Sequence, residues 1–572
     1  MSFQGSNAST PGFSERVRSI LGGPLLGRAI DTLQVNLGYR CNMACAHWNV
    51  SAGPGRQTGF MTINAHGGWI DMQPLDDHNR RLLDNVRPGG WKNPDPASCY
   101  NLVVIGAGTA GLVTAAGAAG LGAKVALVER GLFGGDCLNT GCVPSKGLLR
   151  AARAAHDART AGEFGAACER ASPDFGAAMA RMRGLRVGIS VHDSVARFTK
   201  ELGVDVFLGE GSFTAPGILE VDGKRLRFRK AAICTGSRPA VPDAPGFREA
   251  GFLTNETIFE LTALPPRIAV LGGGPIGCEM AQAFARMGSR VDLLVRGGQV
   301  LPREDADAAA IIQRSLERDG VTVRLNTGVR SVAGTGGEKV VALASNGATS
   351  GLAVDQILAA VGRLPNVDGL GLEKAGVAFD RRRGVVVDDR LRTSNRNVYA
   401  AGDVCSAYQF THAADAMARI VIANSLFRAR QKAADLIIPW CTYTDPEIAH
   451  VGMFEHEASE KGIDVLTLTV PLADVDRAVL DGETEGFARV HLKKGSDRIL
   501  GATVVARHAG DLISELTLAM TARTGLSAIG KTIHPYPTQG EVIRKLADRF
   551  NRMRLTPRIA GLFRAWFRWQ RK

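Results

Sequence analysis

Short apolar runs that end in glycine recur along the chain. The segment YNLVVIGAGTAGL (residues 100–112) is followed by the apolar run VALVER (residues 125–130). This pattern predicts a strand, a glycine-rich turn, a helix and a second strand. The same order returns in RIAVLGGGPIGCEMAQAFARMGSRVDLLV (residues 267–295). Two βαβ units are therefore predicted, and with them an α/β fold class.

Both predicted units carry glycines at the spacing of a dinucleotide-binding turn. These glycines are Gly106, Gly108 and Gly111 in the first unit and Gly272, Gly274 and Gly277 in the second. The first glycine of each set allows a tight turn, the second lets the backbone approach a pyrophosphate, and the third lets the helix pack on the strand. Glu129 ends the second strand of the first unit, where an acid is expected to bind a ribose hydroxyl. We therefore expect two dinucleotide sites.

A pair of cysteines follows the first unit directly. Cys137 and Cys142 lie in GGDCLNTGCVPSK (residues 134–146). The chain has 572 residues and contains 10 cysteines. So few cysteines in a chain of this length do not indicate a disulfide scaffold. A CxxxxC pair beside a βαβ unit fits a redox pair in a reducing cytosol, and two structural cysteines are the alternative.

This arrangement resembles the redox-active disulfide of the flavin-dependent pyridine nucleotide–disulfide oxidoreductases. That family includes glutathione reductase, dihydrolipoamide dehydrogenase and mercuric reductase, and the last is the nearest likeness. The resemblance covers about residues 98–550 and implies two Rossmann-like domains, one for FAD and one for NAD(P). ICTGSRP (residues 233–239) and VYAAGDV (residues 398–404) resemble the later flavin-binding motifs. They add Thr235, Gly236 and Asp403 to the expected FAD contacts.

The same resemblance implies roles for the residues around the cysteine pair. Cys142 matches the flavin-proximal sulfur, and Cys137 matches the sulfur that exchanges with substrate. Lys146 is expected near the flavin N5 atom, where its charge favours a negative charge on the ring. Glu279 matches the glutamate that approaches the nicotinamide side and pairs with Lys146.

The second unit ends its second strand without an acid. Val295 and Arg296 stand at that position, and Arg303 follows. Without the acid, and with arginines near, a 2′-phosphate is favoured over a free 2′-hydroxyl. We expect NADPH as the hydride donor, with NADH as the alternative, in which case the arginines are surface residues. The segment AVGRLPN (residues 360–366), which contains Gly362, resembles the strand that leaves the NAD(P) domain.

The C-terminal part resembles the α+β dimerisation domain of the family. The resemblance lies in CTYTDPEIAHVG (residues 441–452) and ILGATVVARHAGDLISEL (residues 499–516), and it implies a homodimer in which the partner completes each site. The segment IHPYPTQGE (residues 533–541) mixes the histidine of disulfide reductases with the tyrosine of mercuric reductases. We expect His534 or Tyr536 as the acid/base, oriented by Glu541. Alternatively, His534 caps a turn.

The N-terminal segment LQVNLGYRCNMACAHWNVSAGP (residues 33–54) resembles the cluster-binding entry of a radical S-adenosylmethionine enzyme. Cys41 and Cys45 fit that pattern, but Trp48 takes the third position and an indole cannot ligate iron. We expect a degenerate stub without a metal. A site made of Cys41, Cys45 and His47 is the alternative, and it lacks a convincing fourth ligand.

The chain is basic, with a net charge of +13 and an isoelectric point near 9.4. Because no nucleic-acid motif is present, we expect an enzyme that holds anionic cofactors and binds no nucleic acid. The tail LFRAWFRWQRK (residues 562–572) mixes aromatic and basic residues. Peripheral contact with an anionic membrane is one hypothesis for this tail, and a tail that packs on the dimer or is disordered is the other. Since there is neither a membrane-spanning apolar run nor a secretory signal, we expect a cytoplasmic enzyme.

These patterns together predict the domain order. We expect an N-terminal extension with a linker (1–97), a FAD domain in two parts (98–240 and 367–435) around an NAD(P) domain (241–366), a dimerisation domain (436–550) and a basic aromatic tail (551–572). The expected activity is that of an FAD-dependent NAD(P)H oxidoreductase, which reduces a small-molecule disulfide or a thiol-bound metal ion such as Hg(II). A dihydrolipoamide dehydrogenase-type enzyme and a membrane-docked flavoprotein electron donor are the alternatives.

Overall fold

The computed structural model describes residues 72–166, 172–334, 337–345 and 347–571, together with three short strands nearer the N-terminus. These strands, β1 (Gln34–Val35), β2 (Met61–Ile63) and β3 (Trp69–Ile70), form a sheet in the order β1-β2-β3. They belong to a compact unit of Met1–Asp71 and Gly89–Lys92, and a second unit comprises Met72–Pro88 and Asn93–Lys572. The predictions for Cys41, Cys45, His47 and Trp48 lie outside the described residues.

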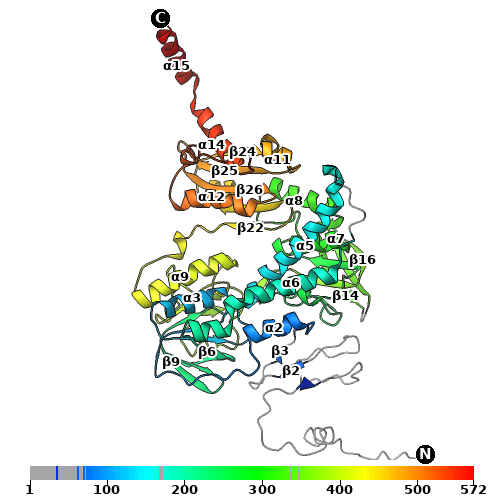
Figure 1. The fold of residues 1–572 in the computed structure, drawn as a ribbon, viewed down its shortest axis with the longest axis vertical. Coiled ribbons are helices and arrows are strands. Elements are labelled where there is room, and N and C mark those ends of the chain that lie inside the picture. Colours follow the sequence, from blue (N-terminus) through cyan, green and yellow to red (C-terminus); the bar gives the residue numbers. More distant parts are fainter. Residues whose placement is uncertain are drawn as a thin grey trace, which may run out of the picture. The chain divides into compact units, whose positions relative to one another are not determined.

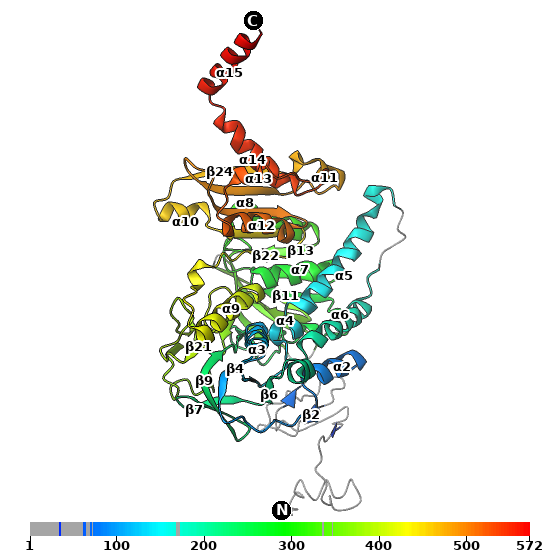
Figure 2. The same cartoon turned by 60° about the vertical axis from the view of Figure 1, so that its left-hand side comes forward.

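A seven-stranded sheet forms the first dinucleotide-binding domain (Figure 1). Its order is β6-β5-β4-β9-β8-β7, with β21 paired to β9. The strands are β4 (Tyr100–Ile105), β5 (Val125–Glu129), β6 (Asp205–Leu208), β7 (Gly211–Ala215), β8 (Ile218–Val221), β9 (Lys224–Ile233) and β21 (Val398–Ala400). The contacts of β4 with β5 and β9 are parallel, as the predicted βαβ unit requires. Helices α3 (Thr109–Gly120) and α9 (Thr411–Phe427) lie side by side in both views (Figures 1 and 2).

The second domain is inserted between β9 and β21. Its parallel sheet has the order β13-β12-β11-β17, made of β11 (Arg267–Leu271), β12 (Arg290–Leu294), β13 (Val321–Arg324) and β17 (Gln356–Ala359). An antiparallel sheet of β14 (Thr327–Ala333), β15 (Lys339–Ser345) and β16 (Ala348–Val354) adjoins it. The strands that enter and leave this domain, β10 (Ser237–Pro239) and β18 (Arg363–Pro365), pair with each other. The structure thus contains two separate sheets with parallel βαβ units, and the second lies within the chain segment between two strands of the first.

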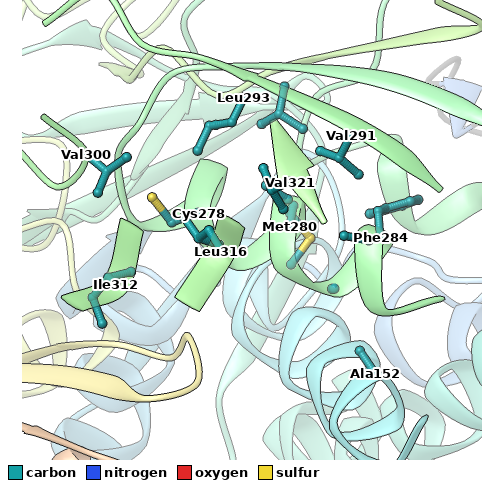
Figure 3. Packing of buried hydrophobic residues seen from close by; sticks show 14 of the residues in the cluster. Ala152, Cys278, Met280, Phe284, Val291, Leu293, Val300, Ile312, Leu316 and Val321 are labelled. Atoms are coloured by element: carbon teal, nitrogen blue, oxygen red, sulfur yellow. The ribbon is translucent and has the colours of Figure 1, made fainter. Parts of the chain in front are cut away.

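Helix α7 (Pro275–Met287) packs between its own sheet and the neighbouring domain. Figure 3 shows Cys278, Met280 and Phe284 of α7 among Val291 and Leu293 of β12 and Ile312 and Leu316 of α8 (Ala306–Arg318). Ala152 of α5 (Cys142–Thr160) belongs to the same buried cluster. The helix that begins at Cys142 is therefore packed directly on the helix that begins at the second glycine turn.

The C-terminal domain is an antiparallel five-stranded sheet with helices, as the α+β prediction requires. Its order is β22-β23-β26-β25-β24, made of β22 (Trp440–Thr442), β23 (Glu447–Gly452), β24 (Val465–Pro471), β25 (Phe487–Lys493) and β26 (Ile499–Ala506). The helices are α10 (Glu455–Glu460), α11 (Asp476–Leu480), α12 (Ala509–Thr521), α13 (Leu526–Ile529) and α14 (Glu541–Arg554). A last helix, α15 (Pro557–Gln570), has no buried residue.

A helix that precedes β4 belongs to the same compact unit as the first dinucleotide-binding domain. Helix α2 (Asp77–Val86) packs against α6 (Phe175–Ser190) and is capped by the carboxylate of Asp76. The compact unit accordingly begins at Met72, whereas the domain boundary predicted from sequence was residue 98. Residues 72–88 therefore belong to the same compact unit as the sheet that contains β4.

Candidate functional site

The two glycine turns have the geometry that a bound pyrophosphate needs. Gly106 has a φ of +99°, and a Cβ there would lie 2.4 Å from the carbonyl oxygen of Cys234. At Gly111 a Cβ would lie 1.7 Å from the carbonyl oxygen of Gly106, so only glycine lets α3 pack this closely on β4. Gly108 is the N-cap of α3, which directs the unpaired amides of the helix into the turn.

The second turn repeats this geometry. Gly272 has a φ of +111°, and a Cβ at Gly277 would lie 1.8 Å from the carbonyl oxygen of Gly272. Gly274 is the N-cap of α7. Gly362, at φ +118°, lies just before β18. Both turns therefore fit a dinucleotide phosphate on the evidence of their own backbone.

The acidic residue expected at the ribose is well placed to accept hydrogen bonds. The carboxylate of Glu129 accepts from the backbone N–H groups of Ala107 (2.6 Å) and Gly131 (2.5 Å). Burial raises the pKa of Glu129, which these two hydrogen bonds oppose. An ionised carboxylate has about four lone-pair positions, so two remain for hydroxyl groups of a ribose. The residues present thus fit the adenosine half of FAD.

The later flavin-type motifs meet at one place. Ser237 donates to Asp403 (2.7 Å), and Thr235 donates to the carbonyl oxygen of Asn366 (2.7 Å). Gly236 between them has a φ of +65°. Arg363 approaches Asp403 (3.8 Å) and forms an ion pair with Asp136, the residue before Cys137. The motifs at residues 233–239 and 398–404 are therefore tied to the cysteine loop.

Lys146 and Glu279, which the family resemblance predicts to form a pair, are in contact. Lys146 Nζ lies 2.8 Å from Glu279 Oε2, and Glu279 is 5% exposed. The other oxygen of Glu279 accepts from the backbone N–H of Tyr443 (2.9 Å). Lys146 Nζ also lies 4.4 Å from the centroid of the Tyr443 ring, within the range of a cation–π contact. Three domains thus meet at this ion pair, on α5, α7 and the loop after β22.

The two cysteines have opposite electrostatic environments. Cys137 lies in α4 (Gly135–Asn139), and Cys142 is the first residue of α5, where the helix dipole favours an anion. The pKa of Cys142 is lowered to about 6 by three neighbours. These are a hydrogen bond from Cys137, the Thr411 hydroxyl at 3.6 Å and the charge of Lys146. The contact with Cys142 and burial raise the pKa of Cys137. When both are thiols, Cys142 is therefore the one that ionises near neutral pH.

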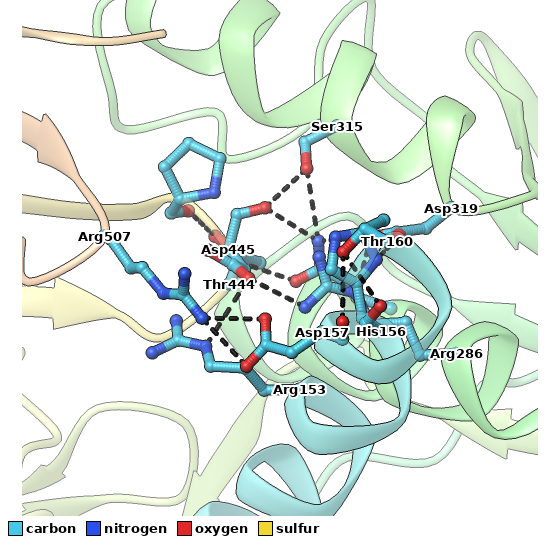
Figure 4. A network of polar contacts seen from close by, with 12 residues as sticks. Arg153, His156, Asp157, Thr160, Arg286, Ser315, Asp319, Thr444, Asp445 and Arg507 are labelled. Atoms are coloured by element: carbon cyan, nitrogen blue, oxygen red, sulfur yellow. Dashed lines mark hydrogen bonds and ion pairs between the residues drawn. The ribbon is translucent and has the colours of Figure 1, made fainter. Parts of the chain in front are cut away.

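A polar network holds α5 against the other two domains (Figure 4). The carboxylate of Asp445 lies 2.9 Å from Arg286 of α7 and 3.4 Å from Arg153 of α5. Arg507 of the C-terminal domain forms an ion pair with Asp157 of α5 (2.8 Å). Helix α5, which carries Cys142 and Lys146, therefore has a second set of interdomain contacts. These begin at Arg153, two helical turns after the Lys146–Glu279 pair.

The candidate acid/base residues have partners inside the C-terminal domain. His534 Nε2 lies 3.0 Å from Glu515 Oε1, and the Tyr536 hydroxyl donates to Asp476 (2.9 Å). Glu541, expected to orient them, begins α14 and lies 3.8 Å from Arg544 on the same helix. In this chain the carboxylate at His534 is therefore Glu515 and not Glu541, because α14 turns Glu541 toward its own basic residues.

The arginines expected at a 2′-phosphate are on the surface. Arg296 directly follows Val295 at the end of β12 and is exposed, and Arg303 is exposed in the next loop. Arg324, at the end of the adjacent β13, forms an ion pair with the buried Asp292 of β12 (2.8 Å). A third cation thus stands at this edge of the sheet, and sequence reasoning did not include it.

A chain of hydrogen bonds that sequence reasoning missed links α2 to the cysteine loop. Arg186 of α6 donates to Asn79 of α2 (2.6 Å) and to the carbonyl oxygen of Asn139 (2.6 Å), two residues after Cys137. Burial lowers the pKa of Arg186 to about 10, so it stays charged at neutral pH. Arg87 donates to the carbonyl oxygens of residues 130 and 131, at the start of the same loop. No sequence motif marks these contacts, which join residues 43 to 107 positions apart.

Comparison with known proteins gives the same architecture. The family model described as pyridine nucleotide-disulphide oxidoreductase matches residues 100–418, and that of its dimerisation domain matches residues 438–547. A mercuric reductase from Staphylococcus aureus is 34% identical over 490 residues, which are 83% of this chain and 89% of the relative. A dihydrolipoyl dehydrogenase from Thermus scotoductus is 35% identical over 462 residues, 79% of this chain and 98% of the relative.

A solved structure is also similar. The Cu(II) complex of the HOCl-induced flavoprotein disulfide reductase RclA from Escherichia coli aligns with a TM-score of 0.70 and 31% identity, over 78% of this chain and 99% of that one. In the part of this chain that the structure describes, no helix is long and apolar enough to cross a membrane. Nor do His, Cys, Asp and Glu side chains within that part gather in threes as a metal site would need.

The thiol electrostatics predict a pH profile. In flavin-free, reduced protein with Cys137→Ser, we expect the rate of alkylation of Cys142 by iodoacetamide to rise with a midpoint near pH 6, because the serine hydroxyl still donates to the sulfur. In Cys137→Ala that donor is absent, so the midpoint should move toward the ordinary thiol value of about 8.5. Mass spectrometry of Cys142 over a pH series measures both. Equal midpoints near 8.5 would contradict the assignment.

The hydrogen-bond chain from α2 predicts a local effect on the cysteine loop. Arg186→Gln should speed amide hydrogen exchange in residues 130–141 by about 10- to 100-fold, since a buried hydrogen bond to a charged group contributes about 1.5–3 kcal/mol. Arg183→Gln is the matched control, because Arg183 bonds Asp76 of α2 (2.6 Å) from the same turn of α6. Hydrogen exchange followed by mass spectrometry separates the two. An equal effect of both variants on residues 130–141 would show that α2 packing alone is responsible.

Proposed function

The chain belongs to the pyridine nucleotide-disulphide oxidoreductases, and from that premise we propose that it is an NADPH-dependent reductase of a small-molecule disulfide or of a thiol-bound metal ion such as Hg(II). Members of the family use FAD and NAD(P)H. The observation that carries the proposal is the contrast between Cys137 and Cys142, one thiol kept protonated and the other ionised beside Lys146.

The glycine turns give each nucleotide a place. In this proposal Gly106, Gly108 and Gly111, with Glu129, hold the adenosine diphosphate of FAD, and the segment with Thr235, Gly236 and Asp403 holds its ribityl end. The turn with Gly272, Gly274 and Gly277, and Gly362 beyond it, holds NADPH. When bound, the flavin supplies two-electron chemistry between a nicotinamide and a disulfide.

The cysteines then carry out thiol–disulfide exchange with the substrate. Cys137 loses its proton to a base, attacks one sulfur of the substrate disulfide and forms a mixed disulfide, while the other substrate sulfur leaves as a thiolate and takes up a proton. The Cys142 thiolate attacks Cys137, which closes the Cys137–Cys142 disulfide and releases the second substrate thiolate. Two electrons pass from the protein pair to the substrate. Lys146 keeps the Cys142 thiolate charge-compensated throughout.

The base that takes the Cys137 proton is proposed to come from a second copy. The chain contains the dimerisation domain of the family, which indicates a homodimer. In such a dimer the His534–Glu515 pair or Tyr536 of the second copy faces the cysteines of the first. His534 is the better general base because its Nε2 atom lies 3.0 Å from Glu515, and a carboxylate at that distance orients the ring for proton transfer.

One observation favours a thiol-bound metal ion as the substrate, and another speaks against it. Five of the similar proteins are named mercuric reductases, and the similar Escherichia coli reductase was solved with Cu(II). Cysteine thiolates are strong ligands for such soft ions. Residues 551–572 hold no cysteine that could pass an ion to Cys137. We therefore place a small-molecule disulfide first and Hg(II) second, with a cytoplasmic location for either.

Two other functions have a specific observation behind them. A dihydrolipoyl dehydrogenase-type enzyme would use the same cysteines in the opposite direction, and relatives of that name match 95–98% of their own length. A flavoprotein electron donor at a membrane would use the exposed helix α15 as its contact. The direction of electron flow distinguishes the first, and vesicle binding tests the second.

Steady-state turnover tests the proposed function. We expect the FAD-loaded protein to oxidise NADPH only when a disulfide such as glutathione disulfide or lipoamide, or thiol-bound Hg(II), is present. Cys137→Ser and Cys142→Ser should each lower that rate by at least about a thousandfold, because each removes one sulfur of the exchange. Cys99→Ser, at an exposed cysteine outside the site, is the matched control and should keep full activity. Turnover that survives in both active-site variants would refute the proposal.

The arginines at the edge of the second sheet predict cofactor preference. Arg296→Glu should raise the KM for NADPH by about 10- to 100-fold, since it replaces attraction to a 2′-phosphate by repulsion, with kcat and the KM for NADH nearly unchanged. Arg248→Glu makes the same charge change at another exposed position of the domain and serves as control. Initial rates against both nucleotides measure the effect. A KM for NADPH that rises equally in both variants would remove Arg296 from the site.

A further inference from the structure

The last helix of the chain is a well-formed helix whose side chains are exposed. It begins with Pro557 at its first position, and the side chain of Thr556 caps it by accepting from the N–H of Ile559. None of its residues is buried. A helix of 14 residues with no tertiary packing is marginal in water, so a stable α15 calls for a surface that covers it.

The apolar side chains of α15 gather on one face. Six large ones follow the spacing of three, four and seven positions that marks one side of a helix: Ile559, Leu562, Phe563, Trp566, Phe567 and Trp569. Trp566 and Trp569 are in ring contact, with centroids 5.0 Å apart, and Phe563 and Phe567 are 6.4 Å apart. Trp566 is 52% exposed and Trp569 is 65% exposed. The face is therefore continuous, aromatic and uncovered in the described part of the chain.

The opposite face carries only positive charge. Arg564, Arg568 and Arg571 follow one another at four and three positions, which places them on one side of the helix, away from Trp566. The segment from Thr556 to Arg571 contains no aspartate or glutamate. Arg552 and Arg554 at the end of α14 add to the charge. A surface that covers α15 must accept both a broad aromatic face and this cationic flank.

We propose that α15 lies in the interface of a lipid bilayer with anionic headgroups, its aromatic face toward the acyl chains and its arginines among the phosphates. Tryptophan is favoured at this depth, and arginine side chains are long enough to reach the headgroups while their stems stay in the apolar layer. At 14 residues with Arg564 and Arg568 inside, the helix suits the plane of the interface and is too short and too charged to span. The inference deepens the candidate function of a flavoprotein electron donor at a membrane, and it does not depend on which substrate the cysteines take.

Pairing with a second copy of α15 is the less favourable alternative. Two such helices face to face would bury the aromatic side chains but would bring two sets of arginines together without a single acidic residue to compensate. An anionic bilayer covers the same face and neutralises the same charge. Charge complementarity therefore favours the lipid surface.

The test is vesicle binding by the full-length, FAD-loaded protein. Vesicles of phosphatidylcholine and of phosphatidylcholine mixed with phosphatidylglycerol are sedimented with wild type and with three variants. One ends at Leu555, one carries Phe563→Ser and Trp566→Ser, and one carries Arg564→Gln, Arg568→Gln and Arg571→Gln. Ala565→Ser, which also introduces a serine but at a position between the two faces, is the control.

We expect wild type and Ala565→Ser to bind the anionic vesicles, and the truncated and aromatic variants to lose that binding. The arginine variant should bind about a hundredfold more weakly, because each cation near an anionic surface contributes roughly fivefold. Added salt should also weaken the binding of wild type to anionic vesicles, because it screens the attraction between the arginines and the headgroups. NADPH oxidation measured separately should be unchanged in all variants, so a failure of catalysis and a failure of docking are read independently.

Three results would overturn the proposal. Equal binding of wild type to neutral and anionic vesicles would remove the role of the arginines. Absence of vesicle binding, together with a change from dimer to monomer when α15 is removed, would assign the helix to the contact between copies of the chain. Absence of binding without that change would equally reject a lipid surface.

Discussion

The buried carboxylate of Glu279 is the constraint on which the arrangement of the three domains depends. A buried charge must be paired, and its partners come from two different domains: Lys146 from α5 and the backbone N–H of Tyr443 from the C-terminal domain. Removing one partner of a fully buried pair costs about 3–5 kcal/mol, and the cost here is smaller because Lys146 is 37% exposed. The Lys146–Glu279 pair therefore fixes the positions of α5, α7 and the loop after β22 relative to one another. The contacts of Asp445 with Arg153 and Arg286 join the same two helices to that loop a second time.

The same geometry sets the chemistry of the cysteines. Because Lys146 is held by Glu279, its charge stays near Cys142 at the N-terminus of α5, and the Cys137 thiol and the Thr411 hydroxyl add donors. The two sulfurs are thereby made unequal before any substrate arrives. An unequal pair is what thiol–disulfide exchange needs, since one sulfur must attack and the other must close the ring. Arg363 and Arg186 anchor the Cys137 loop from two further elements, β18 and α6.

Much of this architecture could be predicted from sequence because its signals are local. The two glycine turns fix strand, turn and helix within about 30 residues, and a Cβ at Gly111 or Gly277 would collide with the backbone. The contact between Lys146 and Glu279 followed from the family resemblance. The partners of His534 and Tyr536 did not, since Glu515 and Asp476 carry no motif and lie 19 and 60 positions away. The place of α2 was missed for the same reason, because its contacts with α6 depend on single polar residues about 107 positions apart. The roles of the individual site residues remain predictions.

The most direct test of the account is an anaerobic titration of the FAD-loaded protein with NADPH, followed by absorbance, in wild type, Cys142→Ala and Cys137→Ala. A long-wavelength charge-transfer band should appear in wild type as the disulfide is reduced, if the Cys142 thiolate is the sulfur that contacts the flavin, as we propose. It should be absent in Cys142→Ala, and in Cys137→Ala it should be present without reduction at alkaline pH and fade as the pH is lowered. A wild-type flavin that is reduced without any such band, or a band that survives in Cys142→Ala, would contradict the assignment of Cys142 as the thiolate that contacts the flavin.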